Sequence, residues 1–224
     1  MTIDGPAGSG KSTTAKLVAL RLGYTYLDTG AMYRAMTLKA LESGVDVASP
    51  EALTRMAEST EIRIETEPQG TRVILDGRDV TGLLRSLEVT RNASPVSAAK
   101  GVRERMVELQ REIGRRGGIV AEGRDIGSVV FPDAEVKIYL DAELSERARR
   151  RSRELEAAGT ATKVDELERE LAARDKYDSS REHSPLCVPK GAVIVDTTGL
   201  TIDQQVQRVV DEVKRRQSMG ERRS

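Results

Sequence analysis

The feature that most constrains the fold of this chain is a glycine-rich segment close to its start. Residues 5–12 read Gly5-Pro6-Ala7-Gly8-Ser9-Gly10-Lys11-Ser12 and fit the pattern G-x-x-x-x-G-K-[ST]. The segment follows a short apolar run and precedes a helical stretch. Glycines let such a loop curl so that successive backbone N–H groups point at one phosphate, and the helix N-terminus adds a partial positive charge. The motif predicts a strand–loop–helix unit that binds a phosphate chain.

The rest of the chain alternates short apolar runs with longer helical segments, which is typical of a parallel α/β sheet. Residues 2–4 are short for a central strand, which leaves open whether the natural chain begins further upstream. The expected strands are 2–4, 24–27, 119–122, 136–140 and 192–196. The first expected helices are 11–22, which Gly23 ends, 31–43, and one that starts at Pro50 after a Ser49 cap. A further helix is expected through Val102 and Ile113, followed by a charge-dense helical stretch over 144–176 that is interrupted near Gly159. The last expected helix runs through Ile202 and Val213 and precedes a frayed tail at 215–224.

One segment breaks this alternation. Ile62 and Ile64 alternate with polar residues, residues 68–70 form a turn signal, and Val73 and Leu75 alternate again. This pattern predicts an antiparallel hairpin over residues 61–80, inserted outside the parallel sheet.

Composition excludes several functions. The chain of 224 residues carries 36 basic and 36 acidic residues and only 3% aromatic residues, which argues against a protein that coats nucleic acid. We expect a cytoplasmic protein, because no apolar run approaches 18 residues and no leader pattern precedes the first strand. The single Cys187 and the single His183 lie four residues apart around Pro185, and no motif supports a role for them as a catalytic nucleophile and base.

The basic residues are unevenly divided between two types: 27 are arginine and nine are lysine. Arginine grips phosphate at two points, whereas lysine acts as a point charge. The imbalance favours small phosphate-bearing ligands as partners.

The phosphate loop alone fits several classes of protein. A GTPase needs D-x-x-G and N-K-x-D; residues 79–82 and 196–199 fit the first pattern, but the second is missing. A motor-type ATPase usually has adjacent acids after an apolar strand, and Asp-Glu is missing there as well. A kinase for a small molecule remains.

Five segments in order over nearly the whole chain resemble bacterial cytidylate kinase. They are residues 5–12, Leu27-Asp28-Thr29-Gly30-Ala31-Met32-Tyr33-Arg34, Gly123-Arg124-Asp125-Ile126-Gly127, Val130-Phe131-Pro132-Asp133-Ala134, and Arg174-Asp175 with Asp178 and Arg181. The resemblance implies one P-loop kinase domain over residues 1–224. Its expected fold is a three-layer α/β P-loop kinase fold with a five-stranded parallel sheet, an inserted antiparallel hairpin subdomain for CMP at about residues 31–100, and a short arginine-rich helical lid at about residues 145–165.

The resemblance also implies roles for individual residues. The donor nucleotide ATP would be bound by Gly5, Pro6, Ala7, Gly8, Ser9, Gly10, Lys11, Ser12 and Thr13, with Ser12 also holding Mg²⁺. Phosphoryl transfer would rely on Lys11, Arg124, Arg147, Arg151 and Arg174. The monophosphate substrate would be bound by Thr29, Tyr33, Arg34, Ser94, Arg103, Arg124, Asp125, Arg174, Asp178 and Arg181.

Within this set, Asp125 can accept a hydrogen bond from the exocyclic amine of cytosine, where uracil presents a carbonyl. The implied reaction is therefore phosphorylation of CMP or dCMP by ATP and Mg²⁺ in a monomeric enzyme. Two rivals stay open from the residues: a kinase for another acceptor such as UMP, and an ATP-binding regulatory module that transfers nothing.

Overall fold

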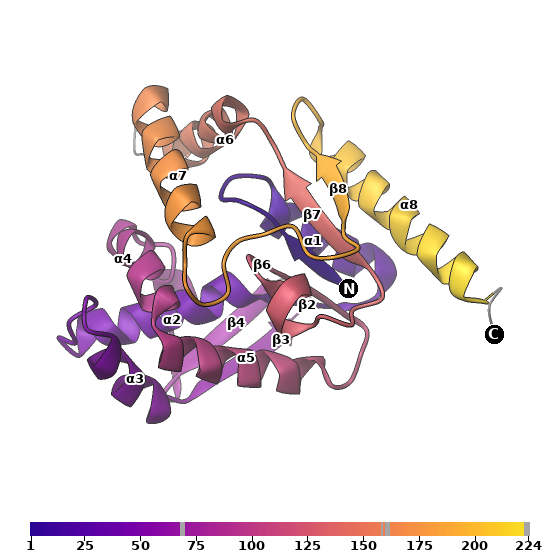
Figure 1. Cartoon of the computed structure of the whole chain (residues 1–224). Coiled ribbons are helices and arrows are strands. Elements are labelled where there is room, and N and C mark those ends of the chain that lie inside the picture. The colour runs from indigo at the N-terminus through magenta and orange to yellow at the C-terminus, as the bar shows by residue number, and fades with distance from the viewer. Residues whose placement is uncertain (68–69, 158, 160–161, 222–224) are drawn as a thin grey trace. The chain divides into compact units, whose positions relative to one another are not determined.

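The computed structural model describes residues 1–67, 70–157, 159 and 162–221, and the chain divides into two compact units (Figure 1). Unit 1 comprises Met1–Tyr24 and Val120–Ser224, and unit 2 comprises Thr25–Ile119. The strands form a five-stranded sheet in the order β2-β6-β1-β7-β8 and a three-stranded sheet in the order β3-β4-β5. The predicted combination of a five-stranded parallel sheet with a separate antiparallel hairpin is confirmed. In the described part of the chain, no helix is long and apolar enough to cross a membrane.

Unit 1 is built around β1. Its elements are β1 (Thr2–Asp4), α1 (Lys11–Leu22), β6 (Ile119–Gly123, whose first residue ends unit 2), the single π turn η2 (Ile126–Val130), β7 (Lys137–Asp141), α6 (Leu144–Ala157), α7 (Val164–Ser179), β8 (Val193–Asp196) and α8 (Ile202–Glu221). β1 pairs in parallel with β6 on one side and β7 on the other, and β7 pairs in parallel with β8. The three residues of β1 are fully buried, as expected for a central strand despite its shortness.

Helices α1 and α8 pack side by side within unit 1 (Figure 1). Val18 of α1 and Val206 and Val209 of α8 are fully buried there. α1 has the predicted bounds, because Gly23 adopts the left-handed conformation (φ 67°) that ends a helix. The predicted frayed tail is wrong over the described residues, since α8 continues to Glu221. Ion pairs from Glu212 to Arg215 and Arg216 support the added turn.

Unit 2 contains the predicted hairpin. Its elements are β2 (Thr25–Asp28), α2 (Thr29–Glu42), α3 (Pro50–Glu58), β3 (Ile62–Glu67), β4 (Gly70–Leu75), β5 (Arg78–Asp79), the short 3-10 turn η1 (Thr81–Leu83), α4 (Leu87–Ala98) and α5 (Lys100–Gly114). β3 and β4 pair antiparallel with Ile62 opposite Leu75 and Ile64 opposite Val73, so the alternation set the register. Most of the predicted turn, Pro68 and Gln69, lies outside the described residues, as do residues 158, 160 and 161 in the predicted break between α6 and α7.

Two features of unit 2 differ from the sequence-based expectation. α2 begins at Thr29 rather than at Ala31, because the Asp28 carboxylate accepts a hydrogen bond from the Ala31 N–H (2.8 Å) and caps the helix earlier. α4 was not predicted, because Pro95 lies inside it and polar residues interrupt its apolar pattern. It packs against α2 and α5.

Candidate active site

The phosphate loop joins β1 to α1 and depends on glycine at three positions. Gly5, Gly8 and Gly10 have φ angles of 148°, 77° and 91°, a region that side chains rarely adopt. A Cβ atom at Gly5 would lie 2.0 Å from the carbonyl oxygen of Leu140 in β7. The loop therefore adopts the backbone shape that the motif requires, and its tight contact with β7 explains why glycine stands at the first position.

Lys11, the first residue of α1, is 5% exposed, and its Nζ donates a hydrogen bond to the carbonyl oxygen of Pro6 (2.6 Å). The pKa of Lys11 is lowered to about 7, mainly by burial and also by the positive charges of Arg124 and Arg174. The carboxylates of Glu122 and Asp4 act in the opposite direction. The structure thus gathers three of the predicted catalytic residues, Lys11, Arg124 and Arg174, into one electrostatic cluster within unit 1.

Asp4, at the end of β1, is a residue that sequence reasoning missed. It is fully buried, and its carboxylate accepts hydrogen bonds from the backbone N–H groups of Ile126 (2.7 Å) and Gly127 (2.8 Å). Burial raises its pKa to about 6, against the lowering effect of these two hydrogen bonds. Asp4 therefore holds the start of η2, directly after the predicted substrate residues Arg124 and Asp125. A charged residue at the end of a buried strand was the available signal.

Three of the predicted substrate residues form a buried ion-pair network. Arg124 Nε donates to Asp178 Oδ2 (3.0 Å), and Arg181 Nη2 donates to Asp178 Oδ1. The Asp178 side chain is 1% exposed, so its charge is compensated by two guanidinium groups rather than by water. Asp125, whose backbone oxygen accepts from Val129 N at the start of the π turn, is 3% exposed.

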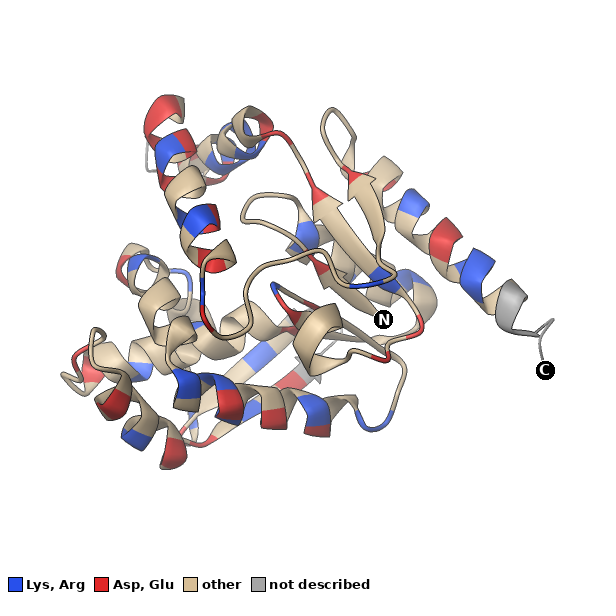
Figure 2. Cartoon of the chain, in the orientation of Figure 1, with Lys and Arg blue, Asp and Glu red and all other residues tan. Residues whose placement is uncertain are grey.

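The two predicted lid arginines lie in different surroundings on α6. Arg147 is buried, and its guanidinium contacts Ala142 O (2.9 Å), Ala7 O of the phosphate loop (3.1 Å) and Asp175 Oδ2 of α7 (2.6 Å). Arg151 is one-third exposed and pairs with Glu154 on its own helix. Both α6 and α7 carry basic and acidic residues along their length (Figure 2). Ala7 also belongs to one buried apolar cluster with Ala148, Leu167 and Leu171, so the phosphate loop, α6 and α7 share a small core.

In unit 2, Arg34 and Thr29 lie in the first turns of α2. Arg34 Nη2 donates to the Asp28 carboxylate (2.9 Å), the same carboxylate that caps the helix. A Cβ atom at Gly30 would lie 3.0 Å from Arg34 Nη1, so glycine leaves room for this guanidinium. Thr29 is 2% exposed at the helix start.

The other predicted substrate residues of unit 2 come together between α2, α4 and α5. The guanidinium of Arg103 lies 5.3 Å from the ring centre of Tyr33 and donates to the carbonyl oxygen of Ser97 (3.0 Å). Ser94, one turn earlier on α4, accepts a hydrogen bond from Ser97 Oγ at its carbonyl oxygen. Arg103 is 4% exposed and thus held by protein groups.

The side chains at the start of α1 fit a small hard cation with a phosphate ligand. Ser12 and Thr13 are exposed, while Glu122 is a buried carboxylate near Lys11. No cluster of three or more histidine, cysteine or acidic side chains occurs among the residues that the structure describes. Mg²⁺ needs only one or two protein oxygens when phosphates and water supply the rest, so the available oxygens suit it better than a zinc-type site.

The central strand of the parallel sheet leads through a glycine-rich loop into a helix that starts with a buried lysine. This arrangement defines a P-loop nucleotide-binding protein. A family model described as cytidylate kinase matches residues 1–215. The chain therefore belongs to the cytidylate kinase family.

Curated relatives of the same name match over almost their full length. The cytidylate kinase of Carboxydothermus hydrogenoformans is 47% identical over 96% of this chain and 97% of its own. That of Chlorobaculum tepidum is 51% identical over 96% of this chain and 92% of its own. Among solved structures, the crystal structure of TT1252 from Thermus thermophilus aligns over 95% of this chain and 94% of its own, with 21% identity and a TM-score of 0.46.

Proposed function

We propose that the protein transfers the γ-phosphoryl group of ATP to CMP or dCMP, giving ADP and CDP or dCDP, in pyrimidine nucleotide metabolism. An oxygen of the acceptor phosphate attacks the γ-phosphorus, and the bond from that phosphorus to the β-phosphate oxygen breaks in line. The observation that carries the proposal is the cluster of buried Lys11 with the half-buried Arg124 and Arg174 beside a P-loop, in a member of this family. These cations can stabilise charge that spreads over the moving phosphoryl group.

On the donor side, the proposal assigns ATP to the loop of residues 5–13. The loop N–H groups and Lys11 bind the phosphates, and Ser12 supplies the hydroxyl that would hold Mg²⁺. When bound, Mg²⁺ neutralises charge on the β- and γ-phosphates. Arg147 and Arg151 complete the donor side in the proposed lid at about residues 145–165, and lid closure would exclude water that competes as acceptor.

On the acceptor side, the proposal assigns the CMP phosphate to Arg34, Arg124 and Arg174 and the ribose hydroxyls to Asp178. The base would be bound by Asp125, Ser94, Arg103 and Arg181, with Thr29 contacting the base or nearby backbone; Tyr33 is assigned to the substrate site without a more specific role. The low exposure of Asp125 and Arg103 supports this assignment, because buried polar groups discriminate strongly between bases that do and do not pair with them.

We further propose a single kinase domain with a CMP-binding insert at about residues 31–100, working as a monomer in the cytoplasm without nucleic-acid partners. The compact packing of Thr25–Ile119 as a unit supports the insert.

The test is a coupled assay of ADP release with ATP, Mg²⁺ and one acceptor at a time: CMP, dCMP, UMP or AMP. We expect the highest kcat/KM with CMP or dCMP. A preference for UMP or AMP would reassign the acceptor, and ATP binding without ADP release for any acceptor would indicate a regulatory module instead.

A further inference from the structure

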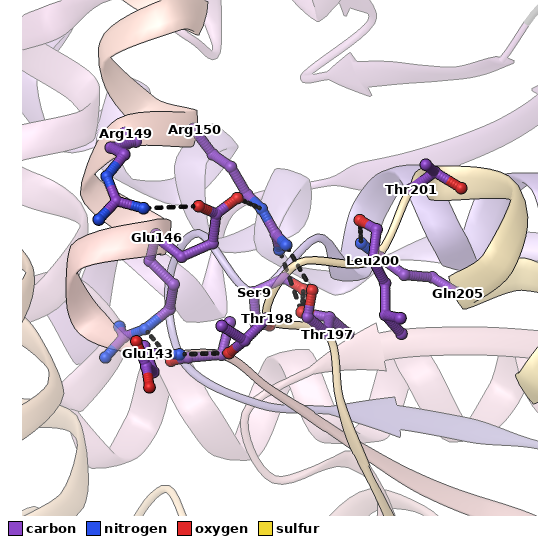
Figure 3. Close-up of polar contacts among 12 residues, drawn as sticks. Ser9, Glu143, Glu146, Arg149, Arg150, Thr197, Thr198, Leu200, Thr201 and Gln205 are labelled. Atoms are coloured by element: carbon purple, nitrogen blue, oxygen red, sulfur yellow. Dashed lines mark hydrogen bonds and ion pairs between the residues drawn. The ribbon is translucent and has the colours of Figure 1, made fainter.

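The loop that follows β8 contacts the phosphate loop through a buried threonine. Thr197 is fully buried, and its backbone N–H donates to Asp141 O at the end of β7 (2.8 Å). Its hydroxyl Oγ1 lies 3.1 Å from the carbonyl oxygen of Ser9 and 2.9 Å from that of Asp141. Figure 3 shows Thr197 beside Ser9. The Thr197 hydroxyl therefore gives Ser9 O a hydrogen-bond partner from outside the phosphate loop, while Asp141 O also receives the Thr197 N–H.

Arg150 of α6 fixes the direction of that hydroxyl. Its Nη1 donates to Thr197 Oγ1 (3.0 Å), its Nη2 donates to Thr197 O (2.6 Å), and its Nε donates to Glu146 (3.0 Å). With the hydroxyl oxygen occupied as an acceptor, the hydroxyl hydrogen is left to point at the carbonyl oxygens of Ser9 and Asp141. The guanidinium is thus engaged on all three nitrogens and 16% exposed, which suits a brace rather than a phosphate ligand (Figure 3).

The neighbouring arginines lack this connection. Arg149 and Arg151 pair with Glu146 and Glu154 of their own helix, and the Arg149 side chain is 54% exposed. Arg149 shares the Glu146 carboxylate with Arg150 (Figure 3), so its ion pair stays within α6. The link from α6 to Thr197 is therefore specific to Arg150 among these three.

The position of Ser9 gives the contact a consequence for ligand binding. The Ser9 carbonyl and the Gly10 N–H belong to one planar trans peptide, so they point in opposite directions. A partner that holds the carbonyl on one side turns the N–H to the other. We propose that Thr197, oriented by Arg150, is a positioning residue that aims the Gly10 N–H at a phosphate of the bound triphosphate. The proposal rests on the proposed function insofar as that function places ATP in this loop.

A second contact joins α1, the helix that follows the phosphate loop, to α8 independently of Thr197. Thr14 Oγ1 of α1 donates to Gln205 Oε1 (3.1 Å), and Gln205 Nε2 donates to Leu200 O (3.2 Å). A variant that loses only the Thr197 hydroxyl keeps this attachment, and valine matches threonine in shape. The variant Thr197→Val is thus expected to fold.

The experiment measures dissociation constants of ATP, ADP and CMP by calorimetry, together with KM and kcat in the coupled assay. We expect Thr197→Val to weaken ATP and ADP about tenfold, the effect of one misdirected hydrogen bond, and to leave CMP affinity within about twofold of wild type. Thr197→Ser keeps the hydroxyl and should restore nucleotide affinity. Arg150→Met should weaken ATP in the same direction by a smaller factor, and adding it to Thr197→Val should cause little further loss.

Arg149→Met is the matched control, because it removes a charge from the same helix and the same glutamate without touching Thr197; its ATP affinity should equal that of wild type. The inference fails if Thr197→Val binds ATP normally, or if ATP affinity, CMP affinity and melting temperature all fall together in both Thr197→Val and Arg150→Met. If the variants show the expected pattern of ATP affinities but the wild-type protein does not phosphorylate CMP, the proposed function is overturned and this inference stands.

Discussion

The two sheets of this molecule treat charge in opposite ways. At the end of β1 in unit 1, Asp4, Lys11 and Glu122 are all at most 5% exposed. On the antiparallel sheet of unit 2, Arg72 pairs with Glu65 and Asp79, and all three side chains are about two-fifths exposed. Burying a charge costs free energy that surface pairs do not pay. Charged side chains are therefore buried next to the phosphate loop, whereas those of the antiparallel sheet stay in contact with water.

The largest difference should appear when the buried lysine is removed. Lys11→Ala should lower kcat by about a thousandfold, because a cation in a water-excluded site has no substitute there, and should leave the CMP dissociation constant within about twofold of wild type. The coupled assay and calorimetry measure the two quantities. Lys16→Ala, an exposed lysine of the same helix, is the control and should retain activity. Full activity of Lys11→Ala would remove the phosphate loop from the mechanism.

The buried carboxylate of Asp4 should make stability depend on pH. Its pKa is raised from 3.8 to about 6, so between these values the folded state holds a proton that the unfolded state has released. The free energy of unfolding of wild type should therefore fall by about 2 kcal/mol as the pH rises from 4 to 7, relative to Asp4→Asn. The groups that face Asp4 are Lys11 and Asp125 and the two N–H donors of η2. Urea unfolding of both proteins across this range measures the difference, and parallel curves would contradict the prediction.

A smaller and more selective effect is expected at Asp125, which is also buried beside β1. Asp125→Ala should lower kcat/KM for CMP by ten- to a hundredfold more than for UMP, because only cytosine offers an amine to the carboxylate. Assays with both acceptors give the ratio. Asp133→Ala, an exposed acid eight residues further on, should leave it unchanged. Equal losses for both substrates would place base selection elsewhere.

The exposed sheet should show the smallest effect. Arg72→Gln removes both of its ion pairs, yet the melting temperature should fall by less than about 3 °C because exposed pairs contribute little. Glu65→Gln, which removes one partner, should have a still smaller effect. Calorimetric melting of the three proteins tests this, and a loss comparable to that of a buried ion pair would erase the contrast between the two sheets.

Much of the fold could be predicted from local patterns. The loop motif predicted α1 within its observed bounds, and alternating Ile62, Ile64, Val73 and Leu75 predicted the β3–β4 register. Prediction failed where local signals opposed the structure. α4 was missed because Pro95 lies inside it and cannot donate a backbone hydrogen bond. The helix forms nonetheless, because the packing of its buried residues Val89 and Val96 outweighs the lost hydrogen bond.

The candidate site was predicted only as residue types in matching segments. The sequence alone determined that residues 5–12 would form a phosphate loop, since glycine positions and helix start are encoded locally. Only the tertiary structure decided what holds that loop. Asp4 accepts hydrogen bonds from Ile126 and Gly127, which lie 122 and 123 positions further along the chain, and Thr197 bonds to Ser9 over a separation of 188 positions. Such hydrogen bonds leave no periodicity in the sequence, because the partners meet only after sheet order and helix packing have brought distant segments together.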